Sequence, residues 1–96
     1  MKKRPSPAMT KDAWIGDAVL SLYLRGRILE QQGTVDGAKA ARMSSNAALG
    51  TVAQPTFVEA QIGVAFQRGW LTEAFRWIEE QVLPALERWE AKQVRR

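Results

Sequence analysis

The amino-acid sequence predicts a single all-helical domain, and three observations lead to that expectation. A chain of 96 residues has room for one domain with a modest core. Hydrophobic residues make up 46% of it, too many for a disordered protein, and no continuous apolar run is long enough to cross a membrane. Apolar residues recur with helical spacing, whereas no segment alternates with period two for long enough to predict a strand.

The first predicted helix follows a flexible basic tail over residues 1–9. Thr10 or Asp12 can cap its beginning, and Gly33 with the following Thr34 ends it after about Gln32. Its apolar positions have the spacing of one helical face. They are Trp14, Ile15, Ala18, Val19, Leu22 and Leu29.

Two further helices are predicted in the middle of the chain. Asp36 is expected to cap an alanine-rich helix from about 37 to 53, which Pro55 stops. The next helix spans about 56–68, with Gly69 as its C-terminal stop. Because apolar side chains surround this helix almost completely, we expect it to be buried on several sides.

A fourth helix is predicted from about 72 to 92, with a kink or break possible at Pro84. The domain therefore spans residues 10–92, and residues 93–96 form a basic C-terminal tail. The inward stripe of this helix comprises Phe75, Ile78, Val82, Leu86 and Trp89. The residues expected to face water are Glu79, Glu80, Glu87, Arg88 and Glu90.

Composition restricts the chemistry that the protein can perform. There is no cysteine and no histidine, which excludes disulfides, thiol catalysis, imidazole acid–base chemistry and the usual zinc sites. The net charge is +4, concentrated at the two ends, which suits a polyanion such as nucleic acid and equally suits ordinary solubilising termini. Prolines follow the N-terminal basic residues where a signal peptide needs an apolar core, so we expect a cytoplasmic protein.

Two carboxylates lie within the two most apolar predicted helices, Asp17 in the first and Glu59 in the third. An ionised carboxylate in apolar surroundings is costly unless something compensates it. Each could simply cap a helix or point at water. If the two instead converge, they could share a proton or hold a hard divalent cation, which takes oxygen ligands.

Three segments resemble the ribonuclease III endonuclease domain, in the order found in that family. Residues 15–24, "IGDAVLSLYL", resemble its signature helix, which usually reads like "LEFLGDAVL". Residues 43–50, "MSSNAALG", are similar to the segment "LVSNETLA". Residues 57–66, "FVEAQIGVAF", followed by Gly69, resemble the second acidic motif, of the form "FEALIGALYLDGG".

The resemblance implies that Asp17 and Glu59 are catalytic residues that bind Mg²⁺, or Mn²⁺ in its place. The family's other two acids are replaced, by Ala13 and Thr56. The small Mini-III ribonucleases, which lack a double-stranded-RNA-binding domain, also carry Ala and Thr there and still cleave. This chain is shorter still, because only nine residues, 51–59, run from the end of the middle segment to the second acid.

The resemblance also implies a symmetric dimer, in which the signature helix packs against its own copy. Candidate interface residues are Ile15, Ala18, Val19 and Leu22, which could instead fill the core of one chain. RNA would be recognised by its backbone and A-form shape. Candidate RNA-binding residues are Arg25, Arg27, Lys39, Arg42 and Asn46.

Two functions follow from these observations. The first is a Mg²⁺-dependent endoribonuclease that cleaves double-stranded or structured RNA, by analogy with Mini-III a ribosomal RNA precursor. The second is a catalytically inactive ribonuclease III-fold dimer that binds RNA or a ribonucleoprotein. Retention of Asp17 and Glu59 favours the enzyme, whereas the two missing acids and the short middle segment favour the inactive module.

Overall fold

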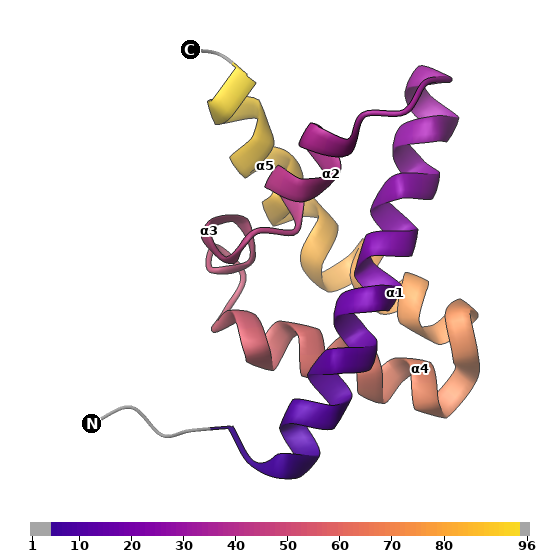
Figure 1. Ribbon diagram of the computed structural model, residues 1–96, viewed down its shortest axis with the longest axis vertical. Coiled ribbons are helices and arrows are strands. Elements are labelled where there is room, and N and C mark those ends of the chain that lie inside the picture. The colour runs from indigo at the N-terminus through magenta and orange to yellow at the C-terminus, as the bar shows by residue number, and fades with distance from the viewer. Residues whose placement is uncertain (1–4, 95–96) are drawn as a thin grey trace.

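The computed structural model describes residues 5–94, and over that range the chain is all-helical, as predicted (Figure 1). The lysines and arginines of the predicted tails at 1–4 and 95–96 lie outside the described residues. No helix of the described part is long and apolar enough to cross a membrane. The elements are α1 (Pro7–Gln32), α2 (Gly37–Met43), α3 (Asn46–Leu49), α4 (Pro55–Trp77), the π-helical turn η1 (Ile78–Val82) and α5 (Leu83–Val94).

Helix α1 begins at Pro7, ahead of both predicted caps, Thr10 and Asp12, and ends where predicted. Ser6 caps it, because the Ser6 side chain accepts a hydrogen bond from the Met9 N–H at 3.1 Å, and Pro7 fits the first helical position, which needs no donor. At the other end Gly33 adopts a left-handed conformation with φ of 74°, and its N–H donates to the Leu29 carbonyl. Residues 7–9 are therefore helical.

The single helix predicted over 37–53 is wrong, because the chain forms two short helices there. Asp36 does cap α2, accepting from the Lys39 N–H at 3.0 Å. The break falls at two serines whose side chains bond to nearby backbone: Ser44 Oγ donates to the Ala40 carbonyl, and Ser45 Oγ accepts from the Ala48 N–H. Serine competes with the helix for backbone partners in this way, and here it starts the new helix α3.

The predicted stop at Gly69 is a kink inside α4. Gly69 and Trp70 both leave helical geometry, and Trp70 takes φ of 54°, a region that a residue with a bulky side chain adopts only at a cost of about 1–3 kcal/mol. The Trp70 ring packs edge-on against Phe66 with ring centroids 4.6 Å apart, yet Trp70 is 72% exposed.

The irregularity expected at Pro84 lies just before it, in η1. Proline has no N–H and its ring clashes with the carbonyl four residues earlier, so the preceding turn widens. The Leu83 N–H accordingly donates to the Ile78 carbonyl, five residues back. The chain then continues into α5, which extends to Val94, into the predicted C-terminal tail.

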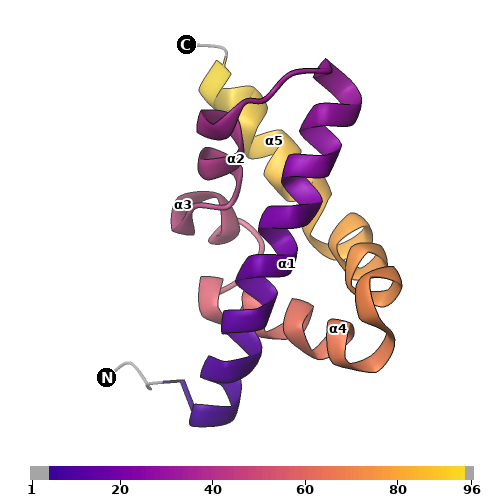
Figure 2. The ribbon, with the colours of Figure 1, turned by 45° about the vertical axis from the view of Figure 1, so that its right-hand side comes forward.

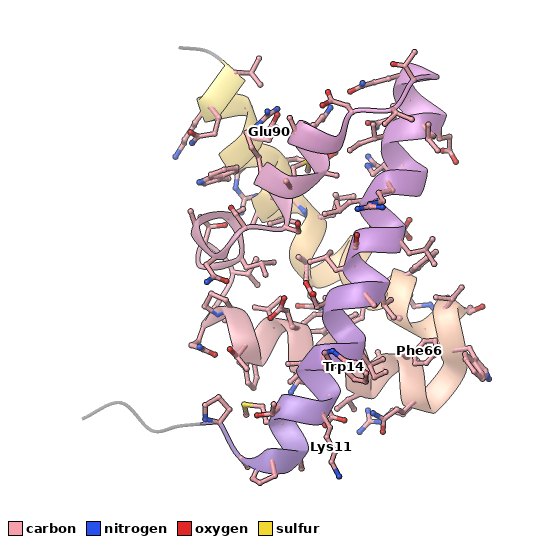
Figure 3. The ribbon with its side chains drawn as sticks, in the orientation of Figure 1. Lys11, Trp14, Phe66 and Glu90 are labelled. Atoms are coloured by element: carbon pink, nitrogen blue, oxygen red, sulfur yellow. The ribbon has the colours of Figure 1, made fainter. Side chains whose placement is uncertain are left out.

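The core lies between α1, α4 and α5, with α2 and α3 on one side of α1 and the kink of α4 on the other (Figures 1 and 2). The inward stripe predicted for the last helix is confirmed, since Ile78, Val82 and Leu86 are fully buried. Glu90 was expected to face water but is only 7% exposed, between α2 and α5 (Figure 3). It accepts hydrogen bonds from Arg42 Nε and Nη2 at 3.1 and 2.7 Å, which offsets the cost of burying its charge.

Candidate functional site

Two glycines let the backbones of α1 and α4 touch where they cross. A Cβ atom on Gly16 would overlap the carbonyl oxygen of Glu59, and a Cβ on Gly63 would overlap the carbonyl oxygen of Asp12. Both obstacles are backbone atoms, which cannot swing aside as the end of a side chain can. The absence of side chains at these two positions therefore sets the distance between the helices.

This crossing brings Asp17 and Glu59 together. Asp17 follows Gly16 on α1, and Glu59 lies in the second turn of α4, with its own carbonyl against Gly16. The two carboxyl groups lie close enough that Asp17, through a side-chain hydrogen bond and its negative charge, helps to raise the pKa of Glu59. Asp17 is exposed and Glu59 half-buried, so the pair opens to solvent from the Asp17 side.

The environment of Glu59 favours its protonated form. Burial raises the pKa of this carboxyl from 4.5 to about 7, with the hydrogen bond to Asp17 and the negative charge of Asp17 adding to the shift. At neutral pH the pair therefore carries between one and two negative charges. A divalent cation placed between the carboxylates would compensate that charge and displace the remaining proton.

We expect the unfolding free energy of the metal-free protein to fall as the pH rises from 5 to 8. The unfolded chain releases the Glu59 proton near its ordinary pKa of 4.5, whereas the native chain keeps it until about pH 7, so the native state is favoured at low pH. Since Glu59 is partly exposed, solvent reduces the effect to about 1 kcal/mol.

Urea denaturation at pH 5, 6, 7 and 8 in the presence of a chelator measures this loss. The window is nearly free of other titrations, because the chain has no histidine. Glu59→Gln, which cannot titrate, should flatten the profile. An unchanged slope in that variant would show that another group is responsible.

The two replaced acidic positions are occupied by groups that cannot bind a cation strongly. Ala13 is buried and Thr56 half-buried. Over residues 5–94, no group of three or more acidic residues forms that could hold a metal ion. Two carboxylates with oxygen donors still fit Mg²⁺, which commonly takes one or two protein carboxylates and completes its shell with water and phosphate oxygens.

Three of the five predicted RNA-binding residues already have partners within the chain, and two of these three, Arg27 and Lys39, line one surface hollow. Arg27 is paired with Glu87 at 3.0 Å, and Arg42 with the buried Glu90 at 2.7 Å. Lys39 Nζ donates to the Gln32 side chain at 3.0 Å. The other two residues of that set, Arg25 on α1 and Asn46 at the start of α3, are exposed.

The predicted dimer contacts divide between surface and core. Ala18 and Leu22 are exposed and Ile15 is half-buried, whereas Val19 is 6% exposed and belongs to the core, so its assignment to an interface is corrected. Trp14, which is not among these predicted contacts, is 78% exposed and lies on the side of α1 toward Phe66 (Figure 3). Trp14 lies four residues before Ala18 and eight before Leu22, a spacing that places the three side chains on one face of the helix.

Comparisons of the chain with models of protein families, with curated proteins and with solved structures gave no match. The motifs of the sequence and the geometry of the acid pair are therefore the features that indicate a function.

Proposed function

We propose that the protein is a Mg²⁺-dependent endoribonuclease of the ribonuclease III type, acting in the cytoplasm on double-stranded or structured RNA such as a ribosomal RNA precursor. The observation that carries the proposal is the meeting of Asp17 and Glu59 at the crossing of α1 and α4. Both acids lie in the segments that resemble the acidic motifs of that family, and they come from different helices.

In this proposal Asp17 and Glu59 hold the cation, and each has its own part. Asp17 has an exposed carboxylate that a cation can reach directly from solvent. Glu59, whose pKa is raised to about 7, would give up its proton if a cation bound to the pair. When bound there, Mg²⁺ would supply an activated water and would offset the charge that develops on the phosphodiester. The chain needs no imidazole base for this chemistry, which agrees with its lack of histidine.

We further propose that two copies pair through the exposed apolar face of α1, formed by Trp14, Ala18 and Leu22. Leu22 and Leu71 line the same surface hollow, which extends this face toward the kink of α4. Large exposed apolar side chains gathered in this way are typical of an interface. Sedimentation should give twice the chain mass, and Leu22→Glu should give the mass of one chain.

The proposed activity is tested by incubating the protein with long double-stranded RNA, with Mg²⁺ or with a chelator. Fragments that appear only with Mg²⁺ support the enzyme. RNA that is bound but never cut, with Mg²⁺ or Mn²⁺, supports the second candidate, an inactive ribonuclease III-fold dimer that binds RNA. One observation favours that candidate: no third acidic side chain joins the pair within the described residues.

A further inference from the structure

Helix α5 carries cations that its own acids do not compensate. Its two glutamates form ion pairs with arginines of other helices, Glu87 with Arg27 and Glu90 with Arg42. Arg88 and Lys92 are exposed and, within residues 5–94, neither is part of an ion pair. They are four residues apart, on one face of the helix, where like charges repel each other. This pair is therefore available to bind an anion from outside the chain.

The two cations border a surface hollow of about 180 Å³. Its other walls are Thr51, Ala85 and Trp89. Trp89 is half-buried and packs against the core, so its position is fixed. Thr51 Oγ1 donates its hydrogen to the Ala48 carbonyl at 2.7 Å, which leaves the Thr51 oxygen able only to accept. An anion that also carries hydroxyl donors would match this lining.

RNA has this chemistry, since each nucleotide joins a phosphate to a 2′-hydroxyl that can donate. The hollow lies between α5 and the turn that follows α3, two elements in contact. Figure 1 places α3, α5 and the first turns of α4, which carry Glu59, on the same side of α1. RNA held at the hollow would therefore lie on the side of the molecule from which α4 brings Glu59 to the crossing.

We propose that Arg88 and Lys92 form a phosphate-binding subsite that anchors RNA, separate from the acid pair. The inference rests on the proposed function in taking RNA as the ligand. The subsite does not depend on cleavage, because its electrostatic contacts with phosphate strengthen RNA binding whether or not the RNA is cut. Lysine and arginine contacts of this kind strengthen binding uniformly across sequences and make it dependent on salt.

The test compares Arg88→Gln/Lys92→Gln with Arg68→Gln/Arg76→Gln, which removes the same charge from α4. Binding of a 30-base-pair RNA duplex is measured in chelator between 50 and 200 mM salt. Each lost phosphate contact lowers the slope of log K against log salt by about 0.9, so the first variant should lose about 1.8 and bind roughly tenfold more weakly. The control should keep most of the wild-type slope. Equal slopes in the two variants would overturn the subsite.

Cleavage at saturating RNA separates this inference from the proposed activity. The Arg88→Gln/Lys92→Gln protein should need roughly tenfold more RNA than the wild type to reach saturation, since it binds RNA more weakly. A wild-type protein that binds RNA with the expected salt dependence but never cuts it would refute the nuclease and leave the subsite standing. A nuclease whose binding ignores the Arg88 and Lys92 changes would refute the subsite alone.

Discussion

Replacing Gly16 by alanine is expected to lower the unfolding free energy by about 3 kcal/mol or more, the upper end of the effects of overpacking. The added methyl group would overlap the carbonyl oxygen of Glu59, and relief requires α1 and α4 to move apart. Small domains have only about 5–15 kcal/mol of stability, so the loss is a large fraction of the total. Urea unfolding followed by circular dichroism measures it.

Gly26→Ala is the matched control, because it makes the same chemical change in the same helix. A Cβ at Gly26 has no atom within 4 Å, and alanine favours a helix over glycine by about 1 kcal/mol. This variant should therefore be more stable than the wild type. If both alanine variants were stabilised, the close approach at Gly16 would be refuted, and with it the reason that the two carboxyl groups meet.

The second large effect is expected from Asp17→Asn, which should lower the rate of Mg²⁺-dependent RNA cleavage by at least about 1,000-fold. Several kcal/mol of transition-state stabilisation come from a bound cation of this kind, and each 1.4 kcal/mol corresponds to a factor of ten. Because Asp17 is exposed, the substitution should leave the fold intact. Single-turnover cleavage of double-stranded RNA gives the rate.

Asp12→Asn is the control for this change, since it removes the same charge from the same helix. Asp12 accepts a hydrogen bond from Gln67 at 2.7 Å, which an asparagine oxygen can also accept. Its cleavage rate should stay within a few-fold of the wild type. Equal losses in the two variants would indicate a general effect of charge, and not a cation held by Asp17.

The all-helical fold and the two members of the acid pair could be predicted from the sequence, because they depend on local patterns. Helical periodicity marked the long helices, and Gly33 marked the end of α1. An isolated carboxylate in each of two apolar helices indicated Asp17 and Glu59 as a candidate pair. That they meet depends on Gly16 and Gly63, which the sequence analysis did not connect to a helix crossing.

The features that the sequence did not predict depend on contacts between distant parts of the chain, which local sequence patterns do not reveal. Glu90 has the position of a solvent-facing residue on α5, and only the approach of Arg42 from α2 makes its burial possible. Val19 shares helical spacing with exposed Ala18 and Leu22, but lies far enough around α1 to enter the core. The break between α2 and α3 was missed because alanine content outweighed the two serines that bond to the backbone.

The most direct test of the account is a calorimetric titration of the protein with Mn²⁺ at pH 7, in two buffers of different ionisation enthalpy. Two carboxyl groups that share one proton and bind one cation should give one ion per chain, with release of about half a proton, because Glu59 titrates near that pH. Asp17→Asn should abolish the binding. A wild-type protein that takes up no ion, or one that binds as well after Asp17→Asn, would contradict the proposal that these two side chains form a metal site.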